Sequence, residues 1–267
     1  EMELALIHEA NLGNPTRVKE LLDAGADVNS PGKGGWTALM YAAYRGHQEV
    51  AGLLLERGAS VNCDETMLIV ASGSGNPEVV RMLLAAGAAV DSRNVHNGDT
   101  PLIWAASLGH TRIVQLLLEN GANISASNKA GMNALGVAAV NEHADTVAFL
   151  IKRGGDPNLR DVTGATVLLH LASTGRSIEI MRMLLDNGAD VNMATPAYRW
   201  TPLLAACAAG RPEVASLFMD RGADLSAVGY QGFTPFTVAL RNGHLDVAAL
   251  VIRYKIKQFF EKWWSTR

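Results

Sequence analysis

The chain is poor in several features that would assign it to a familiar functional class. Its 267 residues include only two cysteines and 6% aromatic residues, and its formal net charge at pH 7 is −3. Two cysteines, Cys63 and Cys207, cannot form the dense disulfide framework of a small secreted domain, and free thiols fit a reducing compartment. A slightly acidic chain also offers no general electrostatic attraction for nucleic acid.

Long apolar runs and a secretion signal are also absent from the sequence. No stretch approaches the roughly 18 apolar residues of a membrane-spanning helix, and the N-terminus has no basic segment followed by an apolar one. We therefore expect a cytoplasmic protein, with the nucleus left open as its compartment. Because the chain begins at Glu1 and not at methionine, it is also open whether it is part of a longer protein.

The short motifs that accompany catalysis are missing as well. The sequence contains no phosphate-binding loop ending in Gly-Lys-Ser/Thr, no Gly-x-Ser-x-Gly turn, no His-Glu-x-x-His and no Cys-x-x-Cys. The 7 histidines fall mostly at turn positions, so none of them calls for a metal ion. We therefore expect a protein that is not an enzyme and that uses neither a cofactor nor a metal.

What the sequence does contain is a repeat. A glycine followed by a small residue recurs at positions 25, 58, 87, 121, 154, 188 and 222, at intervals of 33, 29, 34, 33, 34 and 34 residues. A period near 33 is typical of a solenoid, in which each unit buries its apolar face only by stacking on the next unit. We therefore expect one elongated repeat domain over residues 1–254, with no internal boundary.

The clearest repeat, over residues 98–122, predicts two helices. Thr100 precedes Pro101, and these are the residue types preferred at the N-cap and at the first helical position. Gly109 follows the short apolar helix and favours a left-handed C-cap. A second apolar stripe at helical spacing lies within residues 111–120. The repeat is therefore a helix, a turn, a second helix and then an extended loop, which we call the finger.

The other repeats carry the same pattern in register, namely a Gly-x-Thr-Pro-Leu start, paired alanines, Gly-His between the helices and Gly-Ala-Asp-Val-Asn at the start of the finger. The start is recognisable around Thr37, Thr66, Thr100, Asn133, Thr166, Thr201 and Thr234. This pattern resembles the ankyrin repeat, and the match covers nearly the whole chain. With a first unit from about Leu4 that lacks a finger, the resemblance implies an all-α ankyrin-repeat solenoid of about eight repeats with hairpin-like fingers.

One position departs from the family pattern in every repeat. Ankyrin repeats often carry a histidine directly after the leucine of the first helix. Here that position holds Met40, Ile69, Ile103, Gly136, Leu169, Leu204 and Thr237. We therefore expect that hydrogen bonding between repeats from this site is lost, and that stability rests on apolar packing.

One finger is shorter than most of the others. Eight residue steps separate Gly58 from Thr66, whereas twelve separate Gly25 from Thr37. Loops absorb length changes at little cost, so tolerated variation is one interpretation. The alternative is a notch that admits a bulky partner or bends the stack.

The resemblance implies that partners contact the concave side, which consists of the finger tips and the variable positions of the first helices. Aromatic residues gather at these positions, and tryptophan, tyrosine and arginine dominate the binding energy of many interfaces. We therefore predict that a partner is bound by Trp36, Tyr41, Tyr44, Arg45, Trp104 and Leu108, and by Tyr198, Trp200, Tyr230, Phe233 and Arg241. The alternative for Trp36, Trp200 and Phe233 is simple packing against a neighbouring finger.

Three finger asparagines carry a second hypothesis from the family. Asn29, Asn62 and Asn192 occupy the finger position that intracellular asparaginyl hydroxylases modify in some ankyrin-repeat proteins. The resemblance therefore leaves hydroxylation open. The interpretation that we favour is that their side chains cap the finger turn.

The C-terminal segment departs from the repeat. A glycine is due near Lys255, but the sequence continues without glycine or proline, and apolar residues recur at helical intervals. We expect an amphipathic helical extension over residues 255–267 that caps the end of the solenoid. The alternatives are that it docks on another chain or on a membrane surface. The docking residues would be Phe259, Phe260, Trp263 and Trp264.

The sequence thus predicts an intracellular scaffold or adaptor that binds a protein partner through its concave face. It would act as a monomer, without catalysis and without binding nucleic acid. The alternative is a structural or membrane-proximal module whose C-terminal aromatic and basic helix makes the functional contact.

Overall fold

The computed structural model describes residues 1–62 and 66–265, so Cys63 lies outside the described residues. The chain divides into two compact units, Glu1–Lys129 and Ala130–Arg267, which we describe separately as unit 1 and unit 2. Within the described ranges the regular structure is helical and no β-strand occurs. Arg160 and Thr166 form an isolated bridge in one finger of unit 2.

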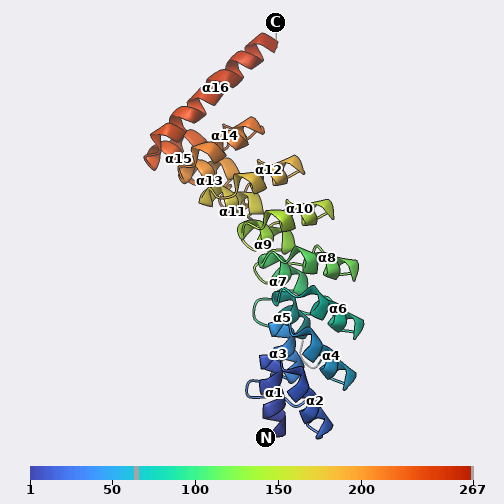
Figure 1. The fold of residues 1–267 in the computed structure, drawn as a ribbon. Helices are drawn as coiled ribbons and strands as arrows, with labels where there is room; N and C mark the ends of the chain where they lie inside the picture. The colour runs from blue at the N-terminus through green and yellow to red at the C-terminus, as the bar shows by residue number, and fades with distance from the viewer. Residues whose placement is uncertain (63–65, 266–267) are drawn as a thin grey trace. The chain divides into compact units, whose positions relative to one another are not determined.

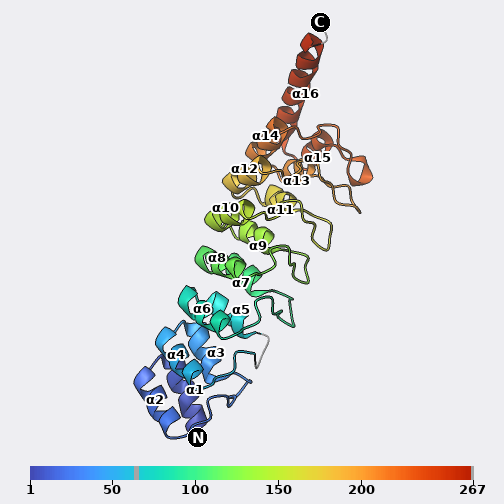
Figure 2. The same ribbon diagram turned by 90° about the vertical axis from the view of Figure 1, so that its right-hand side faces the viewer.

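Unit 1 consists of stacked helix pairs. Its helices are α1 (Met2–Leu12), α2 (Pro15–Asp23), α3 (Ala38–Arg45), α4 (Gln48–Glu56), α5 (Met67–Gly73), α6 (Pro77–Ala85), α7 (Pro101–Ser107) and α8 (Thr111–Glu119). The first helices of the pairs, α1, α3, α5 and α7, pack on one another in that order, and α2, α4, α6 and α8 form a second row (Figure 1). The fingers extend from the first-helix side, away from the second row (Figure 2).

Unit 2 repeats this arrangement. Its helices are α9 (Ala134–Val140), α10 (Ala144–Lys152), α11 (Val167–Thr174), α12 (Ile178–Asp186), α13 (Pro202–Ala208), α14 (Pro212–Asp220), α15 (Pro235–Arg241) and α16 (Leu245–Ser265). A short 3₁₀ turn, Tyr230–Gly232, lies in its last finger. Together the described parts of both units contain eight helix pairs, which confirms the predicted all-α repeat fold. The first helix begins at Met2 rather than near Leu4.

Threonines start most of the first helices, as the sequence predicted. The Thr100 hydroxyl accepts a hydrogen bond from the Ile103 backbone N–H at 3.3 Å, and Pro101 occupies the first helical position. Thr201 caps α13 in the same way, with 3.2 Å to the Leu204 N–H. These caps satisfy backbone donors that the start of a helix leaves without an intrahelical partner.

Apolar side chains fill the position where many ankyrin repeats have a histidine. Met40, Ile103 and Leu204 are each no more than 1% exposed. Cys207 is also buried and free, and burial raises the pKa of its thiol to about 12. Buried apolar side chains therefore occupy these three positions, and the dependence of stability on apolar packing stays a prediction.

Hydrogen bonds between repeats are nevertheless present, and the finger asparagines form a recurring set of them. The Asn29 amide donates to the Gly58 carbonyl at 3.1 Å and accepts from the Ser60 N–H at 2.7 Å. Asn192 forms the same pair of bonds with the Gly222 carbonyl and the Asp224 N–H, at 3.2 and 2.8 Å. Asn62 and Asn158 bridge to their next repeats in the same way.

The prediction that these asparagine side chains cap the finger turn is therefore wrong, because their hydrogen-bond partners lie in the next repeat. The finger turn is capped by the aspartate two residues earlier, since the Asp190 carboxylate accepts from the Asn192 N–H at 2.8 Å and Asp27 does the same for Asn29. The asparagine side chain instead reaches the next repeat, about 30 residues further along the chain. Hydroxylation of these asparagines stays a prediction.

Replacing Asn192 with alanine is expected to destabilise unit 2 by about 1–2 kcal/mol, because two hydrogen bonds between repeats are lost at a partly solvated site. Asn192→Asp keeps the acceptor and removes the donor, so it should lose about half as much. The midpoint of urea unfolding, followed by circular dichroism, measures both variants. An unchanged midpoint for Asn192→Ala would show that the bridge contributes nothing.

One finger of unit 2 carries a part-buried carboxylate that contacts a histidine. The Asp161 carboxylate lies 2.7 Å from His170 Nε2 in α11 and accepts hydrogen bonds from the hydroxyl and N–H of Thr163 and from the Ala165 N–H. Burial raises the pKa of Asp161, but these hydrogen bonds outweigh it and hold the pKa below its ordinary value of 3.8. The charged carboxylate therefore ties the finger to the next first helix.

The contribution of Asp161 should disappear in acid. Because its pKa is lowered by folding, its stabilisation is fully present above pH 3.8 and is lost as the pH falls through the folded-state pKa. Asp161→Asn is expected to lower the free energy of unfolding by about 1.5–3 kcal/mol at neutral pH. Urea titrations from neutral pH to below pH 3.8 test this, and a difference that stays constant over the whole range would contradict it.

Candidate partner-binding groove

A hollow of about 460 Å³ crosses three successive first helices of unit 1. Trp36, just before α3, and Tyr44, within α3, line one side, and Trp104 and Leu108 from the α7 region line the other. Tyr44 is 50% exposed, Trp104 37% and Leu108 41%. We call this hollow the aromatic groove. It brings together four of the six partner-binding residues predicted for the first half of the chain.

Helix α5 supplies the apolar floor of the aromatic groove through Ile69, Val70 and Gly73. Gly73 has ordinary helical backbone geometry, so a left-handed conformation does not explain its presence. A Cβ atom at this position would clash with the indole nitrogen of Trp104. Glycine therefore lets the Trp104 ring lie directly against the backbone of α5.

The side formed by α3 is organised by contacts between its own rings. The Trp36 ring centroid lies 5.1 Å from that of Tyr41 and 5.8 Å from that of Tyr44. The Arg45 guanidinium lies 5.5 Å from the Tyr44 centroid, and its Nε donates to Asn11 Oδ1 at 3.0 Å. Such edge-to-face and cation–π contacts fix aromatic rings beyond simple burial. Tyr41 thus contacts Trp36, Arg45 contacts Tyr44, and both contacts hold the groove-lining rings in place.

Polar residues of the next finger form the remaining edge. Asp99, 8% exposed, is the charged residue among the described lining residues. Its carboxylate accepts hydrogen bonds from Asn97 Nδ2 at 2.6 Å and from Asn128 Nδ2 at 2.8 Å. Asp99 therefore holds the finger in place. The groove can therefore accept apolar or aromatic side chains.

The short finger joins α4 to α5, the helix that forms the floor of the aromatic groove, and its residues 63–65 lie outside the described residues. The described lining of the groove includes none of residues 58–62. A notch and tolerated length variation both stay predictions for this finger.

The aromatic residues predicted for the second half of the chain form a separate cluster in unit 2. Tyr198 and Tyr230 meet edge to face with centroids 5.6 Å apart, and they are 60% and 54% exposed. The Arg241 guanidinium lies 4.7 Å from the ring centroid of Phe233. The Trp200 ring is half-buried against Gly229 of the next finger, which fits the packing alternative for this residue. Their role in binding stays a prediction.

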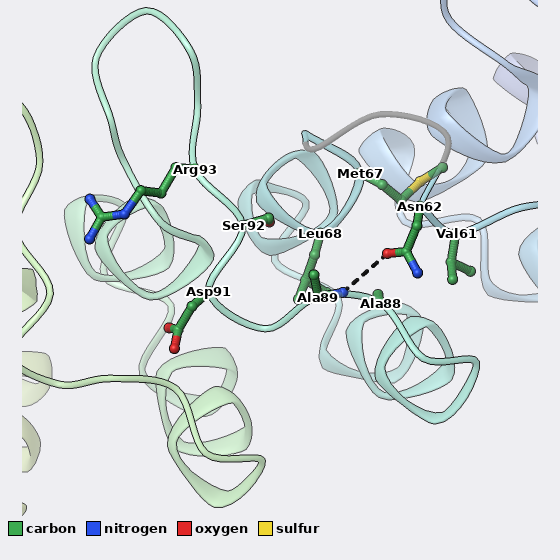
Figure 3. A pocket seen from close by; sticks show the side chains of 9 residues that line it. All are labelled: Val61, Asn62, Met67, Leu68, Ala88, Ala89, Asp91, Ser92 and Arg93. Carbon is green, nitrogen blue, oxygen red and sulfur yellow. Dashed lines mark hydrogen bonds between the residues drawn. The ribbon is translucent and has the colours of Figure 1, made fainter.

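Sequence reasoning missed a second hollow of about 460 Å³ in unit 1. Its lining residues are Val61, Asn62, Met67, Leu68, Ala88, Ala89, Asp91, Ser92 and Arg93 (Figure 3). Asn62 is already engaged there, because it accepts the hydrogen bond from the Ala89 N–H at 3.2 Å. Arg93 is also engaged, since it donates to the Ser127 carbonyl at 2.8 Å. The described lining contains no aromatic side chain, so this hollow offers fewer anchors than the aromatic groove.

The C-terminal residues extend α16 without a break, as the missing glycine predicted. Tyr254 is the last residue of α16 that is part-buried, and its hydroxyl donates to Asp220 Oδ1 at 2.7 Å and lies 2.9 Å from Ser216 Oγ. All described residues from Lys255 to Ser265 are exposed. Whether this extension caps the repeats stays a prediction.

Two features are absent from the described residues, namely a membrane-spanning helix and a metal-binding cluster. None of the helices is long and apolar enough to cross a membrane. No group of three or more His, Cys, Asp or Glu side chains within residues 1–62 and 66–265 is placed to hold a metal ion.

Comparison with known proteins agrees with the repeat pattern. The family model "Ankyrin repeats (3 copies)" matches residues 4–94, 68–161, 125–195 and 169–259. "Ankyrin repeat and KH domain-containing protein mask-1" of Caenorhabditis elegans is 41% identical over 93 residues, which cover 33% of this chain and 4% of that protein. "Ankyrin repeat, SAM and basic leucine zipper domain-containing protein 1" is 44% identical in Oryctolagus cuniculus and 46% in Mus musculus, each over 72 residues, or 26% of this chain and 15% of that protein. The chain thus matches only a small part of these relatives.

Proposed function

The chain belongs to the ankyrin-repeat family, and from this premise we propose that it is a non-catalytic scaffold that binds a protein partner through the aromatic groove of unit 1. Ankyrin repeats are in general modules for protein–protein interaction. The more specific proposal concerns the site and its mode of recognition. An extended or helical segment of the partner would place apolar side chains between Tyr44 and Trp104.

The observation that carries this proposal is a largely apolar hollow lined by organised aromatic rings. Its volume of about 460 Å³ lies within the range of ligand sites, about 300–1,000 Å³. The ring contacts of Trp36, Tyr41 and Tyr44 reduce the conformational freedom that binding would otherwise remove. Exposed, organised tryptophan and tyrosine side chains are also the usual centres of binding energy.

Three further proposals concern the aromatic cluster of unit 2, the oligomeric state and the compartment of the protein. We propose that the Tyr198–Tyr230 cluster of unit 2 is a second contact for a protein partner. We also propose that the protein acts as a monomer in the cytoplasm, where thiols such as the buried Cys207 stay reduced.

A capture experiment tests the proposed site. The full chain is immobilised, and proteins retained by the wild type, by Tyr44→Ala and by Phe149→Ala are identified by mass spectrometry. Phe149 is a matched control, because it is an aromatic residue on the second helix α10 and its ring contacts Arg153. We expect a protein retained by the wild type and by Phe149→Ala to be lost with Tyr44→Ala. Equal retention by all three would overturn the proposed site.

A further inference from the structure

The end of α16 carries an exposed apolar face that the repeats do not cover. Val251 is the last buried residue of the helix. Beyond it, Ile256, Phe259, Phe260 and Trp264 are between 52% and 69% exposed. The aromatic rings meet in pairs, with centroids 5.7 Å apart for Phe259–Phe260 and 5.0 Å apart for Trp263–Trp264. Large exposed apolar patches on folded proteins mark contact sites.

The helical periodicity gathers these residues on one face. Ile252, Ile256, Phe259 and Trp263 follow one another at steps of four, three and four residues, and Phe260 and Trp264 extend the same face to one side. Glu261 lies on the opposite face, 3.9 Å from the Lys257 ammonium. The exposed end of α16 is therefore amphipathic, with an aromatic face and a polar face.

Cations flank this aromatic face on both sides. At 100° per residue, Lys257 lies at one edge, beyond Trp264, and Lys255 and Lys262 lie along the other edge. Arg253 falls between the directions of Phe260 and Trp264, at the start of the exposed segment. Residues 253–265 contain these four cations and one anion, a net charge of +3. The whole chain carries −3, so the remaining residues together carry −6. Positive charge is thus concentrated on the segment that carries this exposed apolar face.

We propose that α16, from Ile252 to Ser265, docks on an anionic phospholipid surface. Its aromatic face would enter the headgroup region, and the flanking lysines would contact lipid phosphates. An apolar face rich in tryptophan and phenylalanine beside a lysine-rich polar face is typical of helices that lie in a membrane interface. Tryptophan also prefers the boundary between hydrocarbon and water.

The charges of this segment favour a membrane surface over other occupants. None of the described helices is long and apolar enough to cross a membrane, and the four cations and Glu261 of this segment are unfavourable in hydrocarbon, so the segment would lie on a membrane rather than span it. A second copy of this helix would bring cations against cations along both edges. A groove in another protein would need one apolar stripe and would not require cations on both sides of it.

The contacts of Tyr254 determine how the docked helix would hold the repeats. Its hydroxyl binds Ser216 and Asp220 of α14, and the Lys257 ammonium lies 5.8 Å from its ring centroid. The exposed segment is therefore continuous with a helix that is fixed in unit 2. Binding of this segment to a surface would carry the stacked repeats of unit 2 with it.

Vesicle co-sedimentation of the full chain tests the proposal. Vesicles of phosphatidylcholine with added phosphatidylserine are compared with vesicles of phosphatidylcholine alone. We expect the wild type to sediment with the anionic vesicles, and Phe259→Ala with Trp263→Ala to weaken this binding about tenfold or more. Lys255→Gln with Lys262→Gln should weaken it about 25-fold, because each cation near an anionic surface strengthens binding about fivefold. Gln258→Ala, on the polar face, is the matched control and should bind like the wild type.

Several outcomes would overturn the proposal. The wild type would then fail to sediment with the anionic vesicles, or it would bind both kinds of vesicle equally. Equal binding to anionic vesicles by the lysine variant and the wild type would also overturn the proposal. Self-association of the wild type without lipid, lost in the aromatic variant, would assign the face to a second copy of the chain. Tyr44→Ala should sediment like the wild type, so this test and the test of the aromatic groove fail independently.

Discussion

Replacing Trp104 with alanine is expected to weaken binding of a captured protein partner about 30-fold or more, which corresponds to the loss of about 2 kcal/mol at a central interface residue. We expect this loss because Trp104 lies across the floor of the aromatic groove from Tyr44 and remains 37% exposed, so a partner can contact it. A partner side chain in the groove would lose one side of its apolar contact. Isothermal titration of the purified partner measures this change.

The effect on folding should be much smaller than the effect on binding. The Trp104 ring lies on the surface of α5, outside the rows of buried helix contacts, so we expect its removal to cost about 1 kcal/mol of stability. Gly73→Ala gives an independent check, because the added Cβ displaces the indole without removing it. It should weaken binding in the same direction. Wild-type affinity in both variants would contradict the predicted role of Trp104.

Replacing Phe218 with alanine is expected to lower the stability of unit 2 by about 3–5 kcal/mol. Phe218 in α14 is 0% exposed and is among the largest fully buried side chains of the described chain. Its loss removes apolar contacts and leaves a cavity beside α13 and α16, the helices on which α14 packs. Repeats bury their apolar faces only against neighbours, so the damage cannot be confined to one repeat.

Urea unfolding followed by circular dichroism measures the loss at Phe218. Phe149→Ala is the control within the same unit, since Phe149 is only half-buried, and its loss should cost about 1 kcal/mol. A smaller effect at Phe218 than at Phe149 would contradict the view that packing between helix rows dominates the stability of this fold.

The helices could be predicted from the sequence because the signals are local and recur. Thr100, Pro101 and Gly109 have fixed preferences at helix ends, and the spacing of about 33 residues repeats these signals down the chain. The continuation of α16 was predictable for the same reason, as no glycine or proline interrupts it. Its course relative to the repeats was not, because that depends on contacts such as Tyr254 with Asp220.

The bridging asparagines were misassigned because their partners lie a full repeat away. The sequence near Asn29 offers a nearby turn to cap, and only the stacking of repeats brings the Gly58 carbonyl within 3.1 Å of its amide. The preceding aspartate, Asp27, already fills the capping role. Side chains that act between repeats need the stacking geometry, which local preferences do not contain.

The sides of the aromatic groove were predicted from the sequence, but its floor was not. Tyr44, Gly73 and Ser107 occupy the same position of three successive repeats, seven residues after the threonines at 37, 66 and 100. A glycine at a position where the neighbouring repeats have larger side chains indicates an open surface. The sequence does not show what fills that space, because the Trp104 indole that lies against Gly73 comes from the next repeat.

Photo-crosslinking is the most direct test of whether a protein partner binds in the aromatic groove. A photoreactive amino acid is placed at Tyr44, within the aromatic groove, or at Phe149, on the second helix α10, and each full-length protein is irradiated with the captured partner. We expect a covalent adduct from position 44 and none from position 149. An adduct from position 149 alone would place the partner on the second-helix side and contradict binding in the aromatic groove.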